Sequence, residues 1–384
     1  MLKKDNFMNV YNRFNVNFIK GKGTKLWDDS GKEYLDFVSG VAVNCLGHCD
    51  DSIVDTIHNQ SKTLMHVSNL YYTDKQNELA KKITSMGTMG KAFFCNSGTE
   101  AVEAALKIAR KYGRHIDKEK NEIVYMANSF HGRTMGALSV TGKAQYQESF
   151  KPLIGNVVEA KFNNIDSINN CINNNTCAVI LEPVQGEGGI ISADIKFLKE
   201  VQKLCSENNA LLIFDEVQCG AGRLGSFFAY EKFNIIPDII CMAKGLGAGF
   251  PIGAVLAKGK AAEVIQPGDH GSTFGGNPLA SAVALTVIEQ LVDKGIIKEV
   301  NNKGEYFKKK LNELKSNYSC IGEIKGMGLL LGVEFDNSKE IIKKCLHNGL
   351  LLVGAGKNVV RFLPPLNVSY EEIDEAINIL EKSL

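Results

Sequence analysis

The sequence predicts an α/β protein in which helices cover a large, mostly parallel sheet. Short apolar segments alternate with longer amphipathic patterns through the middle of the chain, as in folds whose parallel strands are joined by helices. Several of these segments are apolar throughout, as strands buried on both faces must be. The 384 residues are 44% hydrophobic, so the chain can bury a core that divides between two domains.

The candidate strands of this sheet are the short apolar segments Ala92–Asn96, Glu122–Ala127, Cys177–Glu182, Ala210–Asp215, Asp238–Ala243 and Pro251–Ala257. Amphipathic helices are expected between them at Thr99–Tyr112 and Ile195–Asn208, where apolar residues recur at helical spacing. The Asn-rich segment 163–176 is expected to be a solvated spacer, with at most a short polar helix.

A different pattern begins near Pro278 and predicts a separate α+β unit. Helical residues come first, followed in turn by a strand, a helix, a strand and a final helix at Gly328–Glu334, Ser338–Asn348, Asn358–Leu363 and Tyr370–Ser383. Near the other end of the chain, strand-like segments lie at Thr24–Trp27 and Glu33–Phe37. The four residues between them, 28–31, form a hairpin-type turn sequence.

Charge and hydropathy exclude several classes of partner. The 44 basic and 43 acidic residues give a net charge of +1, so no overall field attracts nucleic acid or an anionic membrane. The N-terminal residues MLKKDNFMNV lack the apolar run of a signal peptide, and no stretch approaches the ~18 apolar residues that a membrane span needs. We therefore expect a cytoplasmic protein with neither nucleic-acid nor membrane partners.

The ten cysteines never fall as Cys-x-x-Cys, and we interpret them as reduced thiols. The cluster Cys45-Leu-Gly-His48-Cys49 could in principle ligate zinc, but no second Cys/His pair stands nearby in the sequence to complete four ligands. Buried small residues are the better interpretation of this cluster, and we expect no metal site.

The first candidate for chemistry is Asn96-Ser97-Gly98-Thr99-Glu100, which lies between an apolar strand and a helix. Small residues there leave backbone N–H groups free at a helix N-terminus, where the helix dipole favours an anion such as phosphate. An ordinary capping box, with Ser97 or Thr99 as the cap, explains the same residues equally well. Both interpretations stay open on this motif alone.

Two further candidates follow predicted strands directly. Asp215 closes one apolar strand and Lys244 follows another, so both are expected at the carboxyl edge of a parallel sheet, where α/β folds bind their ligands. Partial burial there would lower the pKa of the Lys244 amine and make it a usable nucleophile toward a carbonyl. Taken separately, Asp215 could cap the next turn and Lys244 could be a solvated surface residue.

Together these features match the needs of pyridoxal phosphate. Its phosphate needs helix-terminus dipoles, its ring nitrogen needs an acid and its aldehyde needs an amine. Phe130, after another strand, could stack on the ring, although a core aromatic residue would fit the same position.

The motifs occur in the order found in class III pyridoxal-phosphate aminotransferases, which this chain resembles. They are Ser97-Gly-Thr-Glu-Ala101, Phe130-His-Gly-Arg133, Glu182-Pro-Val-Gln-Gly-Glu187-Gly, Asp215-Glu-Val-Gln218-Cys-Gly-Ala-Gly-Arg223, Ala243-Lys244-Gly and Gly271-Ser-Thr273-Phe-Gly-Gly-Asn-Pro278. The acetylornithine aminotransferase branch is the most similar, and the likeness runs from Leu26 to Pro365. The resemblance implies a fold-type I transferase with a seven-stranded sheet in residues 51–280. It also implies a small domain made from residues 1–50 and 281–384.

The resemblance implies a role for each matching residue around the cofactor. Lys244 and Asp215 would be catalytic, with Lys244 joined to the cofactor aldehyde and Asp215 paired with its ring nitrogen. The residues expected to hold pyridoxal 5'-phosphate are Gly98, Thr99, Phe130, Asp215, Glu216, Val217, Gln218, Lys244 and Thr273. Val217 would pack on the ring face opposite Phe130, and Gln218 would reach the ring hydroxyl. Thr273 would act from the neighbouring subunit, which implies a homodimer with a shared active site.

The resemblance also implies two substrate sites. Arg133, with Ser272, would bind the α-carboxylate of N2-acetylornithine. Arg361 would bind 2-oxoglutarate and would pair with Glu187 while the amine donor is bound; a surface ion pair is the plain alternative for Arg361. The implied reaction transfers the ω-amino group of N2-acetylornithine to 2-oxoglutarate and belongs to arginine biosynthesis.

Other amine donors remain open, namely ornithine, succinylornithine, succinyldiaminopimelate and 4-aminobutyrate. Tyr11 matches a tyrosine that ornithine aminotransferases use, so ornithine remains open as a donor. Arg133, in contrast, disfavours 4-aminobutyrate. The family pattern differs at Asp50 and Leu224, which affects only the expected loop shapes.

Two functions outside this reaction fit the sequence less well. A nucleotide-binding dehydrogenase would need Gly-x-Gly-x-x-Gly and a later acid, and Gly245-Leu-Gly247 followed by Pro251 does not provide them. A catalytically dead binding protein of the same fold is disfavoured because Lys244 and Asp215 are both present.

Overall fold

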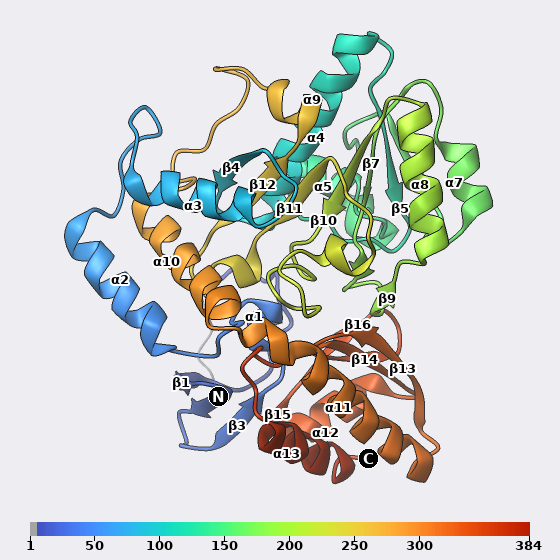
Figure 1. Cartoon of the computed structure of the whole chain (residues 1–384). Helices are drawn as coiled ribbons and strands as arrows, with labels where there is room; N and C mark the ends of the chain where they lie inside the picture. The colour runs from blue at the N-terminus through green and yellow to red at the C-terminus, as the bar shows by residue number, and fades with distance from the viewer. Residues whose placement is uncertain (1–5) are drawn as a thin grey trace.

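A seven-stranded sheet dominates the computed structural model, which describes residues 6–384 (Figure 1). The strands lie in the order β4 (Lys91–Cys95), β12 (Gly253–Ala257), β11 (Ile239–Met242), β10 (Leu211–Asp215), β7 (Thr176–Leu181), β5 (Glu122–Met126) and β6 (Val157–Ala160). All run in one direction except β12, which is antiparallel to both of its neighbours. Residues 1–5, with which the predicted segment 1–50 begins, lie outside the described part.

The central strands are buried on both faces, as their apolar sequences predict. In β10 the side chains of Leu212 and Phe214 belong to one apolar core, whereas Leu211 and Ile213 belong to another. This split follows from the alternation of side chains along a strand. The α/β class with a mostly parallel sheet is thereby confirmed.

Helices cover both faces of the sheet. The long α4 (Gly98–Ile116) packs on the face that carries Leu211 and Ile213, and α8 (Ile195–Glu207) packs on the other. The remaining helices are α1 (Ser39–Ala42), α2 (Asp51–Thr63), α3 (Asp74–Ser85), α5 (Met135–Ser139), α6 (Ala144–Gln147), α7 (Ile165–Cys171), α9 (Gly259–Glu263), α10 (Pro278–Ile288), α11 (Ile296–Asn317), α12 (Ser338–His347) and α13 (Tyr370–Glu381). Within residues 6–384, no helix is both long and apolar enough to cross a membrane.

The expected strands and helices occur within a few residues of their predicted ends. The Asn-rich spacer contains α7, which is the short helix that its composition allowed. The edge strand β6 was missed because it has only four residues, one of them the exposed Glu159. The antiparallel orientation of β12 was not predicted either, because a short apolar segment has the same pattern in a parallel and in an antiparallel strand.

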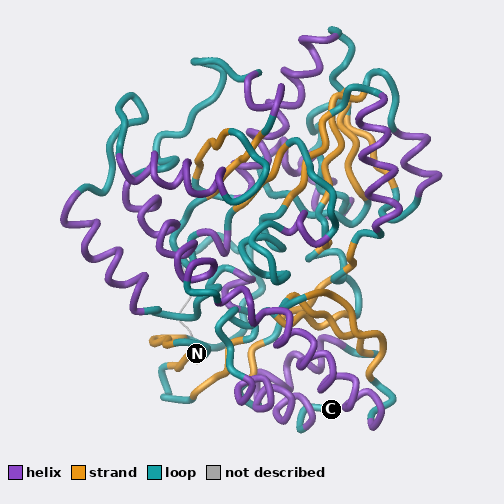
Figure 2. The backbone as a smooth tube through the Cα atoms, viewed as in Figure 1, coloured by secondary structure: helices purple, strands orange, loops and turns teal. Residues whose placement is uncertain are grey.

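The N-terminal and C-terminal parts of the chain meet below the large sheet in Figure 1, where β3 pairs with β15. One small sheet has the order β1 (Phe18–Lys22), β2 (Lys25–Asp28), β3 (Glu33–Asp36) and β15 (Leu350–Leu351). A second has the order β13 (Ile321–Met327), β14 (Leu330–Phe335), β17 (Val359–Phe362) and β16 (Val353–Ala355). A short ribbon pairs β8 (Val184–Gln185) with β9 (Ile191–Ser192). Figure 2 shows these small sheets apart from the large one, with helices packed against them.

The small sheets share an apolar core of their own. Phe37 from the N-terminal part packs edge-on against Phe307 of α11, which in turn packs against Phe362 of β17. Helix α10 lies between the two parts, because Ala284 faces the core of the large sheet and Val287 faces the small one. These contacts favour the division at about residues 50 and 280, which stays a prediction.

Candidate active site

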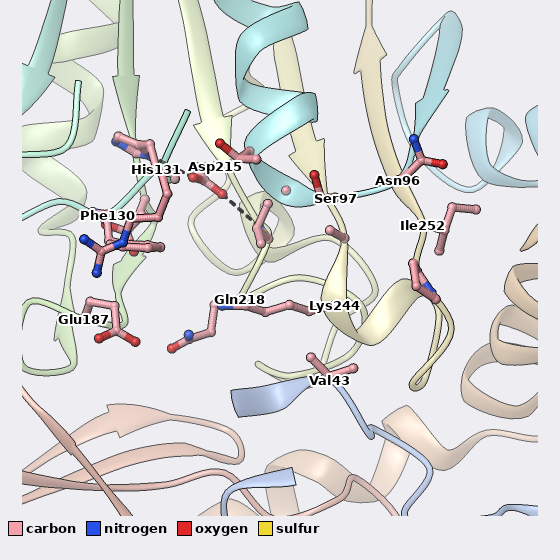
Figure 3. A pocket seen from close by; sticks show the side chains of 18 of the residues that line it. Val43, Asn96, Ser97, Phe130, His131, Glu187, Asp215, Gln218, Lys244 and Ile252 are labelled. Carbon is pink, nitrogen blue, oxygen red and sulfur yellow. Dashed lines mark hydrogen bonds and ion pairs between the residues drawn. The ribbon is translucent and has the colours of Figure 1, made fainter. Parts of the chain in front are cut away.

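The six parallel strands end at one edge of the large sheet, and a cavity of about 400 Å³ lies there. The residues after the carboxyl ends of these strands supply most of its wall. The lining residues are Val43, Asn96, Ser97, Gly98, Thr99, Phe130, His131, Gly132, Arg133, Glu182, Glu187, Asp215, Val217, Gln218, Ala243, Lys244, Gly249, Phe250, Pro251 and Ile252. In Figure 3, Phe130 and Glu187 lie on one side of the cavity and Asn96 and Ser97 lie on the other.

Asp215 is held in a fixed orientation at the end of β10. Its Oδ2 atom is 2.7 Å from Nδ1 of His131, and its Oδ1 atom accepts the backbone N–H of Val217 at 3.0 Å. Both Asp215 and His131 are buried. An acceptor fixed in this way can keep a proton on a ring nitrogen that faces it.

Lys244 enters the same cavity from the end of β11, beside β10 (Figure 3). Its backbone has a φ of 44°, in the left-handed region that lysine seldom adopts, as is common at functional positions. Burial and the nearby charge of Arg361 lower the pKa of its amine, while Glu187 and Asp215 oppose that shift. The amine is therefore more easily neutral than an exposed lysine, and a neutral amine can act as a nucleophile or a base.

The N-terminus of α4 forms another wall of the cavity. The hydroxyl of Ser97 caps the helix by accepting the N–H of Glu100, so the predicted cap is present. The first N–H groups of the helix nevertheless have no acceptor within it and can bind an anion. A Cβ atom on Gly98 would lie 2.7 Å from Cγ1 of Val217, so only glycine fits there without displacing Val217. The capping and anion-binding interpretations are thus compatible.

The other predicted cofactor residues divide into two groups. Phe130, Val217 and Gln218 line the cavity. Glu216 does not, because its carboxylate accepts the backbone N–H groups of Ala229 and Tyr230, at 2.5 and 2.9 Å. Burial raises the pKa of Glu216 to about 8, which suits a structural role at the end of β10.

Arg361 and Glu187 form an ion pair at the cavity wall, with 2.7 Å between Nη2 and Oε1. Arg361 is buried and also donates to the carbonyl of Gly186 and to Oε1 of Gln218, at 3.1 and 2.9 Å. Burial opposes ionisation of Glu187, but Arg361 holds the pKa of that carboxyl below its ordinary value. The plain alternative for Arg361, a surface ion pair, is therefore wrong.

Arg133 lies at the cavity mouth, and within residues 6–384 it has no ion pair. Its guanidinium carbon is 3.8 Å from the ring centroid of Tyr146 and 5.3 Å from that of Phe130. Ser272 and Thr273 do not line this cavity; the Ser272 hydroxyl instead binds Asn96 and Gly275. Tyr11 is also outside the cavity wall, exposed beside Arg13.

His131 and Glu182 also belong to the site, although their places in the sequence motifs did not predict a role for either. Each follows a strand that ends at this edge, and that position was the available signal. Glu182 accepts the N–H groups of Phe130 and Gly186, and burial raises its pKa to about 7, an effect that the charge of His131 opposes.

The cluster from Cys45 to Cys49 has other partners. Cys45 donates to the carbonyl of Gly245, and His48 contacts Asp36 at 2.7 Å. Across the described residues, no group of three or more His, Cys, Asp or Glu side chains is arranged to hold a metal ion.

Comparison with known proteins gives a consistent result. The profile of the aminotransferase class-III family matches residues 7–384. The acetylornithine aminotransferase of Clostridium acetobutylicum is 60% identical, covering 100% of both chains. Among solved structures, an ornithine aminotransferase from Toxoplasma gondii has a TM-score of 0.94 and 33% identity, covering 98% of this chain and 91% of its own. The N-acetylornithine aminotransferase from Stenotrophomonas maltophilia has a TM-score of 0.86 and 33% identity, covering 97% of this chain and 96% of its own.

The charges around Lys244 should control the pKa of its amine. Because Arg361 lowers the pKa of Lys244, we expect Arg361→Met to raise it. Because Glu187 raises that pKa, we expect Glu187→Gln to lower it further. The pH midpoint of Lys244 acetylation by acetic anhydride, followed by mass spectrometry before cofactor is added, should move up in the first variant and down in the second. Equal pH midpoints in the wild type and both variants would show that these charges do not act on Lys244.

Proposed function

The chain belongs to the class-III aminotransferase family, and on that premise we propose the reaction it catalyses. It transfers the ω-amino group of N2-acetyl-L-ornithine to 2-oxoglutarate, giving N-acetyl-L-glutamate 5-semialdehyde and L-glutamate, in arginine biosynthesis. The 60% identity to an acetylornithine aminotransferase supports this choice of donor. One structural observation carries the proposal: a single cavity is lined by Asp215, Lys244 and Arg133, and Glu187 in its wall is paired with a second arginine, Arg361.

The cavity fits pyridoxal 5'-phosphate, the cofactor on which this family depends. The α4 N-terminus with Gly98 and Thr99 would hold its phosphate, and Asp215 would face its ring nitrogen. Phe130 and Val217 would cover the two faces of the ring, and Gln218 would reach its hydroxyl. When bound, the protonated ring supplies an electron sink for the charge left on the reacting carbon.

Side chains of the cavity supply the amine, the base and the partner of the ring nitrogen. Lys244 Nζ would hold the cofactor aldehyde, and once released by the donor amine it would serve as the base that takes the proton from the donor carbon and as the acid that returns it. Its lowered pKa suits both tasks. Asp215, oriented by His131, would keep a proton on the ring nitrogen of the bound cofactor.

Each half-reaction uses a different arginine to bind the carboxylate of its substrate. Arg133 binds the α-carboxylate of the amine donor, while Glu187 neutralises Arg361 through the 2.7 Å ion pair. When 2-oxoglutarate enters, Glu187 moves away and Arg361 binds the carboxylate of the acceptor. The site thereby accepts two carboxylate-bearing substrates in turn.

We extend the proposal to a cytoplasmic homodimer. Exposed apolar residues gather beside the loop that carries Thr273, and they include Met65 (56% exposed), Leu70 (84%), Tyr72 (94%) and Phe274 (60%). The two segments are joined because Asn69 donates to the carbonyls of Ser272 and Gly275. A patch of this kind favours association, and ten free cysteines favour a reducing compartment.

Donor preference tests the substrate assignment. With 2-oxoglutarate as acceptor, we expect kcat/KM for N-acetylornithine to exceed the values for ornithine, succinyldiaminopimelate and 4-aminobutyrate by about tenfold or more. Steady-state assays of the purified, cofactor-loaded enzyme measure this. A preference for ornithine or 4-aminobutyrate would replace the proposed substrate but leave the family and cofactor in place.

Mixed dimers test the shared site. Lys244→Ala and Thr273→Val should each lose activity as pure proteins, Lys244→Ala nearly completely. If Thr273 serves the partner's site, a mixed dimer places both substitutions in one site and leaves the other intact. Unfolding and refolding the two variants together should then restore activity, with each variant refolded alone as the control. No recovery, in a sample shown to contain mixed dimers, would place Thr273 outside the partner's site.

A further inference from the structure

Arg133 stacks on an aromatic ring that lies outside the cavity wall. Tyr146 of α6 lies under the guanidinium, with 3.8 Å between the Arg133 carbon Cζ and the ring centroid. This is a close cation–π contact on the face of the ring. Contact through the ring face leaves the N–H groups of the guanidinium available for a carboxylate, since the ring accepts none of them in a hydrogen bond.

The position of Tyr146 is fixed by its surroundings. Its ring meets Phe130 edge-on, at 6.4 Å between centroids and 88° between planes. Next to it, Gln147 donates to the carbonyls of Leu138 and Thr141 at 3.0 and 2.9 Å, which anchors the short helix α6.

A second cation shares the ring and links it to the other substrate site. The Lys143 amine is 5.5 Å from the Tyr146 centroid and donates to the backbone carbonyl of Glu187 at 2.7 Å. The side chain of Glu187 in turn binds Arg361. Tyr146 therefore lies between the arginine at the mouth and the segment that carries Glu187.

The hydroxyl of Tyr146 has no hydrogen bond to any residue in the range 6–384. The ring alone therefore accounts for its contacts with Arg133 and Phe130. This separates the ring from the hydroxyl experimentally, since phenylalanine keeps the first and removes the second.

We propose that Tyr146 is a specificity-determining positioning residue, which holds Arg133 so that the enzyme selects amine donors carrying an α-carboxylate far from the reacting amine. The inference rests on the proposed function of Arg133 and deepens it. Tyr146 acts through Arg133 and touches no reacting atom. Without the ring, the long arginine side chain would sample many rotamers, and carboxylate binding would have to order it.

Two substitutions and two donors test this. Tyr146→Leu removes the aromatic face, whereas Tyr146→Phe keeps it. N-acetyl-1,4-diaminobutane is N-acetylornithine without its α-carboxylate, so it is the matched donor. In Tyr146→Leu we expect KM for N-acetylornithine to rise about tenfold with kcat within about twofold. The kcat/KM for N-acetyl-1,4-diaminobutane should change little, and Tyr146→Phe should behave like the wild type.

A binding measurement and a second background complete the test. N-acetyl-L-norvaline carries the carboxylate but no ω-amine, and calorimetry should show about tenfold weaker binding to Tyr146→Leu. In an Arg133→Gln background, Tyr146→Leu should have no further effect on either measurement, because the two residues then no longer interact.

The outcomes are distinguishable. Equal losses for both donors in Tyr146→Leu, or an undiminished loss in the Arg133→Gln background, would overturn the role of Tyr146. If the wild type uses ornithine instead of N-acetylornithine, the substrate proposal fails, and the same comparison is made with ornithine and 1,4-diaminobutane. A wild type that gains nothing from the α-carboxylate of either donor would overturn both the role of Arg133 and that of Tyr146.

Discussion

The whole site depends on the direction of the parallel strands. Because β4, β5, β7, β10 and β11 all point the same way, the residues that follow them meet at one edge, although they are far apart in the sequence. That edge brings Asp215 and Lys244 together from neighbouring strands and sets the N-terminus of α4 beside them. The apolar core beneath keeps this arrangement rigid, since the central strands are buried on both faces.

Charge balance at this edge links structure to reactivity. Asp215 pairs with His131 and Glu187 pairs with Arg361, so two buried or partly buried carboxylates have cationic or hydrogen-bonding partners. The same charges act on the Lys244 amine. Burial and Arg361 lower the pKa of this amine, whereas the carboxylates of Glu187 and Asp215 raise it. Movement of Glu187 would therefore change both the acceptor site and the basicity of Lys244, which couples substrate exchange to the state of the amine.

The sequence predicted the framework of the site better than its details. Apolar strands followed by Asp215 and Lys244 placed both at the sheet edge, because strand direction and burial are local signals. The 2.7 Å contact of His131 with Asp215 and the stacking of Arg133 on Tyr146 were missed. Each joins residues whose pairing depends on packing between separate segments. For Glu216 the sequence predicted a contact that the structure does not have. Its position in the motif suggested that it binds the cofactor, but its carboxylate accepts the backbone N–H groups of Ala229 and Tyr230.

The most direct test of this account is to find which lysine the cofactor aldehyde reaches. Borohydride makes a lysine–aldehyde linkage permanent, so reduction of the cofactor-loaded enzyme followed by peptide mass spectrometry identifies the residue. The strand arrangement predicts that the cofactor is attached to Lys244, and that Lys244→Ala carries no stoichiometric label. Attachment to Lys143 or to another lysine in the wild type would contradict the assembly of the site at the ends of β10 and β11.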